Sequence, residues 1–248
     1  MYNRYAVADL HGQLKIYEQI KEYINDDDIV YVLGDCGDRG DHPWTTIKAV
    51  LNDEQFIYLM GNHELMLIQA IDEYLSITKG QEDNDKILSY PKSSGRISDL
   101  YFNGGKLTLK GWFNDPDRMK YYKQLQYLPL ELRLAAKNEQ HFIYLNHAGY
   151  LPTNLCPDIE SFLWDRLHFH DTWDNPDGHI LIHGHTPIQH LHSAVFVGTQ
   201  TVCTQIDTSK GYYMYDNNHR IDIDNGCYTT HQATLINIDT LESVIIKE

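Results

Sequence analysis

Five short segments of this sequence place side chains that could bind metal ions next to glycine. They are Asp9-Leu10-His11-Gly12, Gly34-Asp35-Cys36-Gly37-Asp38-Arg39-Gly40, Gly61-Asn62-His63-Glu64, Asn146-His147-Ala148-Gly149 and His183-Gly184-His185-Thr186-Pro187. Glycine allows close backbone approaches that a Cβ would block. Oxygen and imidazole donors without thiolates favour Mn²⁺, iron or Zn²⁺ over metals that prefer sulfur. The five segments therefore predict a metal site, provided that the fold brings them together.

An apolar run precedes each of these five segments. The runs cover residues 4–8, 29–33, 56–60, 141–145 and 179–182. Short apolar runs of this kind predict buried strands, and in α/β sheets ligands gather outside the carboxyl ends of the strands. A single histidine is more often a packed or surface residue than a ligand. Chance alone, however, does not explain five loops that each follow a strand and combine metal-binding side chains with glycine. Six side chains should then converge on one place: Asp9, His11, Asp35, Asn62, His147 and His185.

The rest of the chain predicts an α/β domain around those loops. Apolar residues at helical spacing indicate helices over 14–24, 44–51 and 65–75. Alternating residues near the C-terminus indicate strands over 233–238 and 244–246.

No linker divides the sequence, so we expect one domain over residues 1–248. Residues 79–125 are less regular and rich in glycine, asparagine, aspartate and proline, and residues 188–220 indicate β-hairpins and loops. We expect both stretches to be inserts that face the substrate.

A local excess of positive charge lies within the first of these inserts. Residues 92–123 contain three acids against seven basic residues: Lys92, Arg96, Lys106, Lys110, Arg118, Lys120 and Lys123. A solvated helical face is the favoured explanation. The alternative is a surface that draws phosphate toward the metal site.

The overall charge and the cysteines exclude several classes of protein. A formal net charge of −15 repels nucleic acid and acidic membranes, so we expect neither as a partner. No apolar run reaches the roughly 18–20 residues of a membrane span, and the first residues lead straight into a strand rather than a signal peptide. We therefore expect a cytoplasmic protein. The four cysteines are scattered, which argues against a disulfide framework or a thiolate metal site.

The ligand set suits two divalent ions bridged by one carboxylate. Ion pairs about 3.5–4 Å apart stabilise the attacking and leaving oxygens of an in-line displacement at phosphorus. The order of the five segments resembles the phosphoprotein phosphatase family of calcineurin-like metallophosphoesterases, above all the small bacterial and bacteriophage lambda-type Ser/Thr protein phosphatases. The resemblance runs from Asp9 to about Asn237 and includes Asn103–Gly105, Trp164–Arg166 and Ile223–Gly226.

The resemblance implies a fold and a role for each matching residue. The fold would be two mixed β-sheets packed as a sandwich and flanked by helices. Asp9 and His11 would hold one metal ion, Asp35 would bridge, and Asn62, His147 and His185 would hold the other. His63 would be the general acid, oriented by Asp38, while Arg39, Arg166 and Asn62 would bind the phosphate. We expect both ions to be Mn²⁺, with iron or Zn²⁺ as alternatives. A hydroxide held by the two ions would attack phosphorus directly, without a phosphoenzyme intermediate.

Four residues depart from the family pattern without removing a ligand: Ala8, Cys36, Gly37 and Asn225. Cys36 adjoins the bridging carboxylate, so thiol oxidation could inhibit the site, although a small buried residue is the simpler interpretation. His183 lies two residues before His185, and the resemblance implies a place near the site rather than on a metal ion.

Three functions remain for a chain of this kind. The first is a metal-dependent phosphomonoesterase of loose selectivity that acts on phosphorylated proteins, peptides or small phosphoesters. Its targets would be phosphoserine and phosphothreonine, with phosphotyrosine as an additional target if the enzyme has dual specificity. The second is a dinucleoside polyphosphate hydrolase of the symmetrical diadenosine tetraphosphatase type, which shares the metal core. The third is a scaffold without activity, and the intact set of ligands, acid and arginines argues against it.

Overall fold

The computed structural model describes residues 2–78, 95–137, 141–152, 158–169, 172–193, 196–197, 200–201 and 207–248. The first sheet contains β1 (Arg4–Val7), β2 (Ile29–Val32), β3 (Phe56–Tyr58), β11 (Gln232–Asn237) and β12 (Ser243–Lys247). The second contains β4 (Glu131–Ala135), β5 (Phe142–Asn146), β6 (Ile180–His183), β9 (Tyr213–Tyr215) and β10 (Arg220–Asp222). A further pair is β7 (Phe196–Val197) with β8 (Gln200–Thr201).

Both five-stranded sheets are mixed. Their strand orders are β12-β11-β1-β2-β3 and β4-β5-β6-β10-β9. Strands β1, β2 and β3 run parallel, as do β5, β6 and β10. Strand β11 is antiparallel to β1, β4 to β5 and β9 to β10, while β12 is antiparallel to β11. Each sheet therefore presents the carboxyl ends of three parallel strands along one edge.

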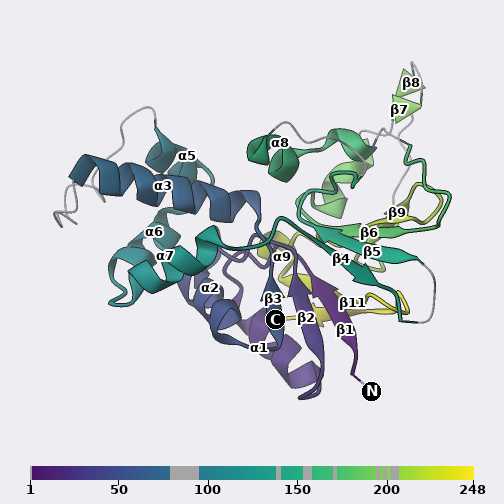
Figure 1. Cartoon of the computed structure of the whole chain (residues 1–248), viewed down its shortest axis with the longest axis horizontal. Coiled ribbons are helices and arrows are strands. Elements are labelled where there is room, and N and C mark those ends of the chain that lie inside the picture. The colour runs from purple at the N-terminus through teal and green to yellow at the C-terminus, as the bar shows by residue number, and fades with distance from the viewer. Residues whose placement is uncertain are drawn as a thin grey trace.

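Helices surround the sheets, and several of them gather at one end of the first sheet (Figure 1). They are α1 (Leu14–Tyr23), α2 (Pro43–Asn52), α3 (Asn62–Thr78), α5 (Arg96–Phe102), α6 (Lys106–Phe113), α7 (Arg118–Gln126), α8 (Ile159–Trp164) and α9 (Cys227–Thr230). Two 3₁₀ helices are η1 (Leu167–Phe169) and η2 (Ile188–Ser193). Among the described residues, no helix combines the length and the apolar character needed to cross a bilayer.

Alternation along the strands of the first sheet builds two cores. Successive strand residues point to opposite faces, so Val7, Val30 and Val32 pack on the helices while Ala6, Tyr31 and Leu33 face the second sheet. The core between the sheets also includes Ile143, Leu145, Ile182, Ile221 and Ile223. The two sheets are thus packed as a sandwich flanked by helices, which confirms the predicted fold class.

The structure corrects the expectation for residues 79–125. The described part of this insert is helical rather than irregular, since it contains α5, α6 and α7. These helices have 7, 8 and 9 residues, too few for helical spacing to emerge in windows of about 11–18 residues. Strand β4 and helix α8 were not predicted either.

Residues 188–220 agree with the expected hairpins only in part. The pair of β7 with β8 and the hairpin of β9 with β10 agree with it, whereas η2 is a 3₁₀ helix. Residues 194–195, 198–199 and 202–206 lie outside the described residues.

Candidate active site

The predicted ligands follow the carboxyl ends of the parallel strands. Asp9 and His11 follow β1, Asp35 follows β2, and Asn62 begins α3 after β3. From the second sheet, His147 follows β5 and His185 follows β6. All six side chains are buried. The structure therefore brings together, from both sheets, the residues that the sequence placed on separate loops.

The backbone is strained at these positions. Of the eleven non-glycine residues with positive φ in the described part of the chain, six are predicted site residues, with values from 42° to 73°: Asp9, His11, Asp35, Asp38, Arg39 and His185. Such conformations cost about 1–3 kcal/mol each and persist where the surrounding structure enforces them, often at functional sites. The concentration of this strain on predicted site residues is independent support for a site here.

One group of ligands consists of Asp35, Asn62, His147 and His185. His147 Nε2 lies 2.8 Å from Asn62 Oδ1, 3.1 Å from His185 Nδ1 and 3.5 Å from Asp35 Oδ1. The Nδ1–H of His147 donates to the Leu33 carbonyl at 2.7 Å, so its Nε2 presents a lone pair. Lone pairs of carboxylate, amide and imidazole thus face one another, and these groups have too few hydrogen-bond donors to pair all of the acceptors. That arrangement fits a divalent cation.

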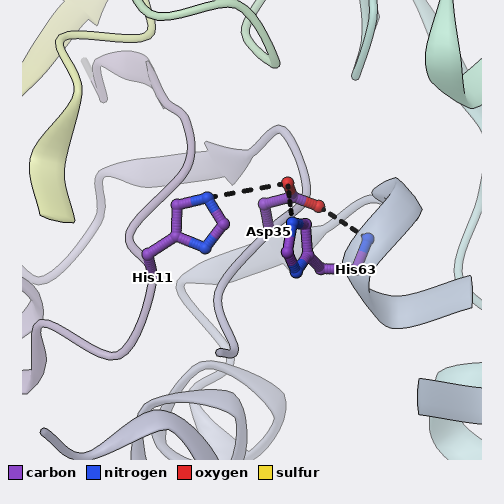
Figure 2. Close-up of side chains that lie close together, drawn as sticks. All are labelled: His11, Asp35 and His63. Carbon is purple, nitrogen blue, oxygen red and sulfur yellow. Dashed lines mark hydrogen bonds and ion pairs between the residues drawn. The ribbon is translucent and has the colours of Figure 1, made fainter. Parts of the chain in front are cut away.

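A second group shares Asp35 with the first. The imidazoles of His11 and His63 both point toward the Asp35 carboxylate, as Figure 2 shows, and each Nε2 lies 3.8 Å from Asp35 Oδ2. His11 donates from Nδ1 to the Gly37 carbonyl at 2.9 Å, so its Nε2 carries the lone pair that a metal ion would need. Asp35 therefore has one oxygen in each group, as a bridging ligand requires.

Electrostatics keep the predicted imidazole ligands neutral. Burial, helped by the positive charge of His63, lowers the pKa of His11 to about 3. Burial also lowers the pKa of His147 and, more strongly, that of His185. Neutral imidazoles can coordinate a metal ion, whereas imidazolium cannot. These three histidines are therefore held in the binding form.

Asp9 lies apart from the two tightest groups. Its Oδ2 accepts a hydrogen bond of 2.9 Å from the His185 N–H, and its side chain is buried. Two further buried acids, Asp222 and Asp224, lie near it, and neither was predicted as a site residue. Burial and the charge of Asp35 raise the pKa of Asp224 to about 7. Buried carboxylates need compensating charge, which two divalent ions would provide.

His63 and Asp38 form a close pair. The Nδ1–H of His63 donates to Asp38 Oδ2 at 2.6 Å, and both side chains are buried. Burial alone would lower the pKa of His63, but the carboxylates of Asp35 and Asp38 outweigh it and raise that pKa. A raised pKa suits a group that must carry a proton near neutral pH.

The two predicted phosphate-binding arginines are exposed at the edge of the buried site. Arg39 donates to His11 Nε2 at 2.8 Å and to His63 Nε2 at 2.9 Å. Each nitrogen has one lone pair, so a cation at His11 requires the guanidinium to leave that ring. Arg166 follows α8, and its positive charge helps to lower the pKa of His147 and His185. The ring of Trp164 packs edge-on against that of His185, with 5.8 Å between the ring centroids.

Glu64 has a structural role that sequence reasoning missed. Its buried carboxylate accepts hydrogen bonds from the N–H groups of Asp35 (2.7 Å), Cys36 (3.1 Å) and Gly61 (3.0 Å), and from the Tyr58 hydroxyl. Burial and the charge of Asp35 raise its pKa to about 7, whereas four donors favour the ionised form. Glu64 thus ties the loop that contains Asp35 to the start of α3.

Glu64→Gln should destabilise the protein and weaken metal binding. The new amide NH₂ would face N–H donors, and an unpaired buried polar group costs about 1–3 kcal/mol. Chemical unfolding and Mn²⁺ titration would measure both effects, with Glu22→Gln on the exposed face of α1 as the control. Equal stability and equal affinity in the two variants would contradict this role.

The structure places Cys36 and His183 away from metal binding. Cys36 is fully buried, and burial, with the charge of Glu64, raises the pKa of its thiol well above the usual value. Thiol oxidation requires an accessible thiolate, so the packing interpretation fits better. His183 lies near the site but directs Nε2 at the Tyr215 hydroxyl (2.8 Å) and Nδ1 at the Gly184 carbonyl (3.0 Å). Of the other cysteines, Cys227 is a buried free thiol, and Cys156 and Cys203 lie outside the described residues.

Three of the seven basic residues of the insert have a local partner among the described residues. Arg96 pairs with Glu160 at 3.1 Å, Arg118 donates to the Phe113 carbonyl, and Lys120 lies over the Tyr121 ring. Lys106, Lys110 and Lys123 are exposed, and Lys92 lies outside the described residues. These contacts favour a solvated helical face over a phosphate-gathering surface.

Comparisons with known proteins agree with this geometry. The model of the calcineurin-like phosphoesterase family matches residues 4–189. Similar solved structures include a candidate diadenosine tetraphosphatase, 14% identical with a TM-score of 0.60, where the match covers 98% of this chain and 92% of that one. A cold-active protein tyrosine phosphatase is 13% identical with a TM-score of 0.52, over 99% of this chain and 79% of that one.

A protein serine/threonine phosphatase from Saccharomyces cerevisiae is 11% identical with a TM-score of 0.50, over 100% of this chain and 80% of that one. At such identities the structural similarity supports the fold alone. No curated protein sequence matches this chain significantly.

Proposed function

We propose that this chain, which belongs to the calcineurin-like phosphoesterase family, hydrolyses phosphate monoesters with the help of metal ions. Its chief substrates would be phosphoserine and phosphothreonine. The observation that carries the proposal is the position of Asp35, whose two oxygens serve two groups of buried ligands beside the Asp38–His63 pair. Phosphoester hydrolysis needs an activated water molecule, charge neutralisation and an acid. Ions held by these ligands would supply the first two, and His63 would supply the third.

The ligands assigned to the ions are Asp9, His11, Asp35, Asn62, His147 and His185. Two divalent ions, which we expect to be Mn²⁺, would acidify a water molecule and neutralise charge on the phosphoryl group. The side chain of His63 would protonate the leaving alkoxide from Nε2, because Asp38 holds its Nδ1. Arg39, Arg166 and Asn62 would hold the phosphoryl oxygens, where the planar guanidinium groups match their geometry.

The lambda-type resemblance favours a phosphatase over a dinucleotide hydrolase. The Asn103–Gly105 segment lies against the site, since Arg39 N–H donates to the Gly104 carbonyl at 3.2 Å. Two of the similar structures are described as phosphatases of proteins. The similar candidate diadenosine tetraphosphatase keeps a dinucleoside polyphosphate hydrolase as the second candidate.

Parallel turnover assays separate these functions. The protein, loaded with Mn²⁺, would be given a phosphoserine peptide, a phosphothreonine peptide, p-nitrophenyl phosphate and diadenosine tetraphosphate, with Asp35→Asn as the inactive control. We expect kcat/KM for the phosphopeptides to exceed that for the dinucleotide by at least about tenfold, or about 1.4 kcal/mol of transition-state stabilisation. Preference for diadenosine tetraphosphate would overturn the choice of substrate, and no turnover of any substrate would overturn the enzymatic function.

A further inference from the structure

Asp38 makes its closest contacts with two residues from different parts of the chain. Its Oδ2 receives the hydrogen bond from His63 Nδ1. Its Oδ1 accepts a short hydrogen bond from the Thr108 hydroxyl, and its own N–H donates to Thr108 Oγ1 at 3.0 Å. Thr108 is 70 residues away in sequence, on α6, and both side chains are fully buried. The paired hydrogen bonds fix which carboxylate oxygen faces His63.

Packing around Thr108 suggests that its hydroxyl serves Asp38 rather than its own helix. Threonine has a low helix propensity and often directs its hydroxyl at the carbonyl one turn before it. Thr46 in α2 does so, donating to the His42 carbonyl at 2.9 Å. Thr108 instead reaches across to the loop that follows β2. Its Cγ2 lies beside Gly37, where a methyl of valine would occupy the same space.

Gly104 and Gly105, just before α6, lie against Arg39 and Asp38, and a Cβ at either position would be too close to its neighbours. Gly104, at φ +92°, accepts from the Arg39 N–H, and a Cβ there would lie 2.9 Å from Arg39 Cγ. A Cβ at Gly105 would lie 2.9 Å from Asp38 Oδ1. Asp38 and Arg39 both have left-handed backbones, with φ of 64° and 61°. The start of α6 therefore supports two consecutive strained residues.

We propose that Thr108 is a positioning residue for the Asp38–His63 pair. The inference rests on the proposed function, because it assigns Thr108 to the protonation of the leaving group. Without the hydroxyl, Asp38 Oδ1 and the Asp38 N–H lose their partner, and the carboxylate can turn away from His63. Small misplacements of this kind cost up to about 10²-fold in rate. The loss should fall on substrates that need a proton and spare those that do not.

Thr108→Val and Thr108→Ser test the proposal on phenyl phosphate, a poor leaving group, and p-nitrophenyl phosphate, a good one. In Thr108→Val we expect kcat for phenyl phosphate to fall about 10- to 100-fold, with kcat for p-nitrophenyl phosphate within about threefold of the parent. KM and metal content should stay unchanged, and Thr108→Ser should restore both rates. Thr46→Val is the matched control, because it removes a buried hydroxyl that donates to the carbonyl of His42, the residue before its own helix.

A spectroscopic readout separates this inference from the proposed function. The His63 Nδ1–H should give a downfield proton NMR signal that His63→Asn abolishes, Thr108→Val shifts or removes, and Thr108→Ser retains. Equal loss of kcat on both substrates, no loss, or failure of serine to restore the rate would overturn the role of Thr108. If the parent protein hydrolyses neither these esters nor the phosphopeptides, the proposed function fails. An unchanged NMR signal in Thr108→Val would still overturn the inference.

Discussion

Asp35→Asn is expected to abolish both metal sites and to lower kcat/KM by about 10³-fold or more, since the ions contribute several kcal/mol of charge stabilisation. Asp35 is the one residue in both groups, with Oδ1 at 3.5 Å from His147 Nε2 and Oδ2 at 3.8 Å from His11 Nε2. An amide keeps one weak oxygen donor but places an NH₂ group where the second ion must bind. Elemental analysis of purified protein and steady-state kinetics would measure the two losses.

The matched control for this variant is Asp41→Asn. Asp41 lies six positions along the chain from Asp35, in an exposed position of the same loop. It should keep the parent metal content and rate. Metal stoichiometry and activity that are the same in Asp35→Asn as in Asp41→Asn would contradict the bridging assignment.

His63→Asn is expected to lower kcat by about 10²- to 10⁴-fold for esters with poor leaving groups, while metal content is retained. The reason is the Asp38–His63 hydrogen bond of 2.6 Å, which leaves the other ring nitrogen to protonate the departing alkoxide. p-Nitrophenolate leaves without much help from an acid, so its ester should lose much less. Comparing phenyl phosphate with p-nitrophenyl phosphate measures this difference.

His190→Asn serves as the control, because His190 is exposed on η2. It should leave both rates unchanged. An equal decrease of kcat for the two esters in His63→Asn would show that His63 is not the general acid. A loss of metal would instead assign His63 to ion binding, because its Nε2 lies 3.8 Å from Asp35 Oδ2.

Sequence patterns predicted the ligand-bearing loops because the relevant constraint is local. Each loop had to follow a strand and to contain glycine, and the carboxyl ends of parallel strands then meet at one edge. That rule brings Asp35 close to Asn62 in the first sheet and His147 close to His185 in the second, and the packing of the two sheets then brings the two pairs together. Strand ends were also accurate to about one or two residues, as for Phe142–Asn146 against the expected 141–145.

The residues that support the site could not be found in this way. Glu64 is 29 residues from Asp35, and Thr108 is 70 residues from Asp38. Their roles depend on which helix packs against which loop, and no spacing in the sequence encodes such a contact. The direction of Arg39 toward His11 and His63, and the burial of Asp222 and Asp224, are likewise consequences of tertiary packing.

Anomalous diffraction from crystals grown with Mn²⁺ tests the central claim most directly. We predict two peaks about 3.5–4 Å apart on either side of the Asp35 carboxylate, one near His11 and the other among Asn62, His147 and His185. A single peak, or peaks away from Asp35, would contradict the two-ion site on which the proposed chemistry depends.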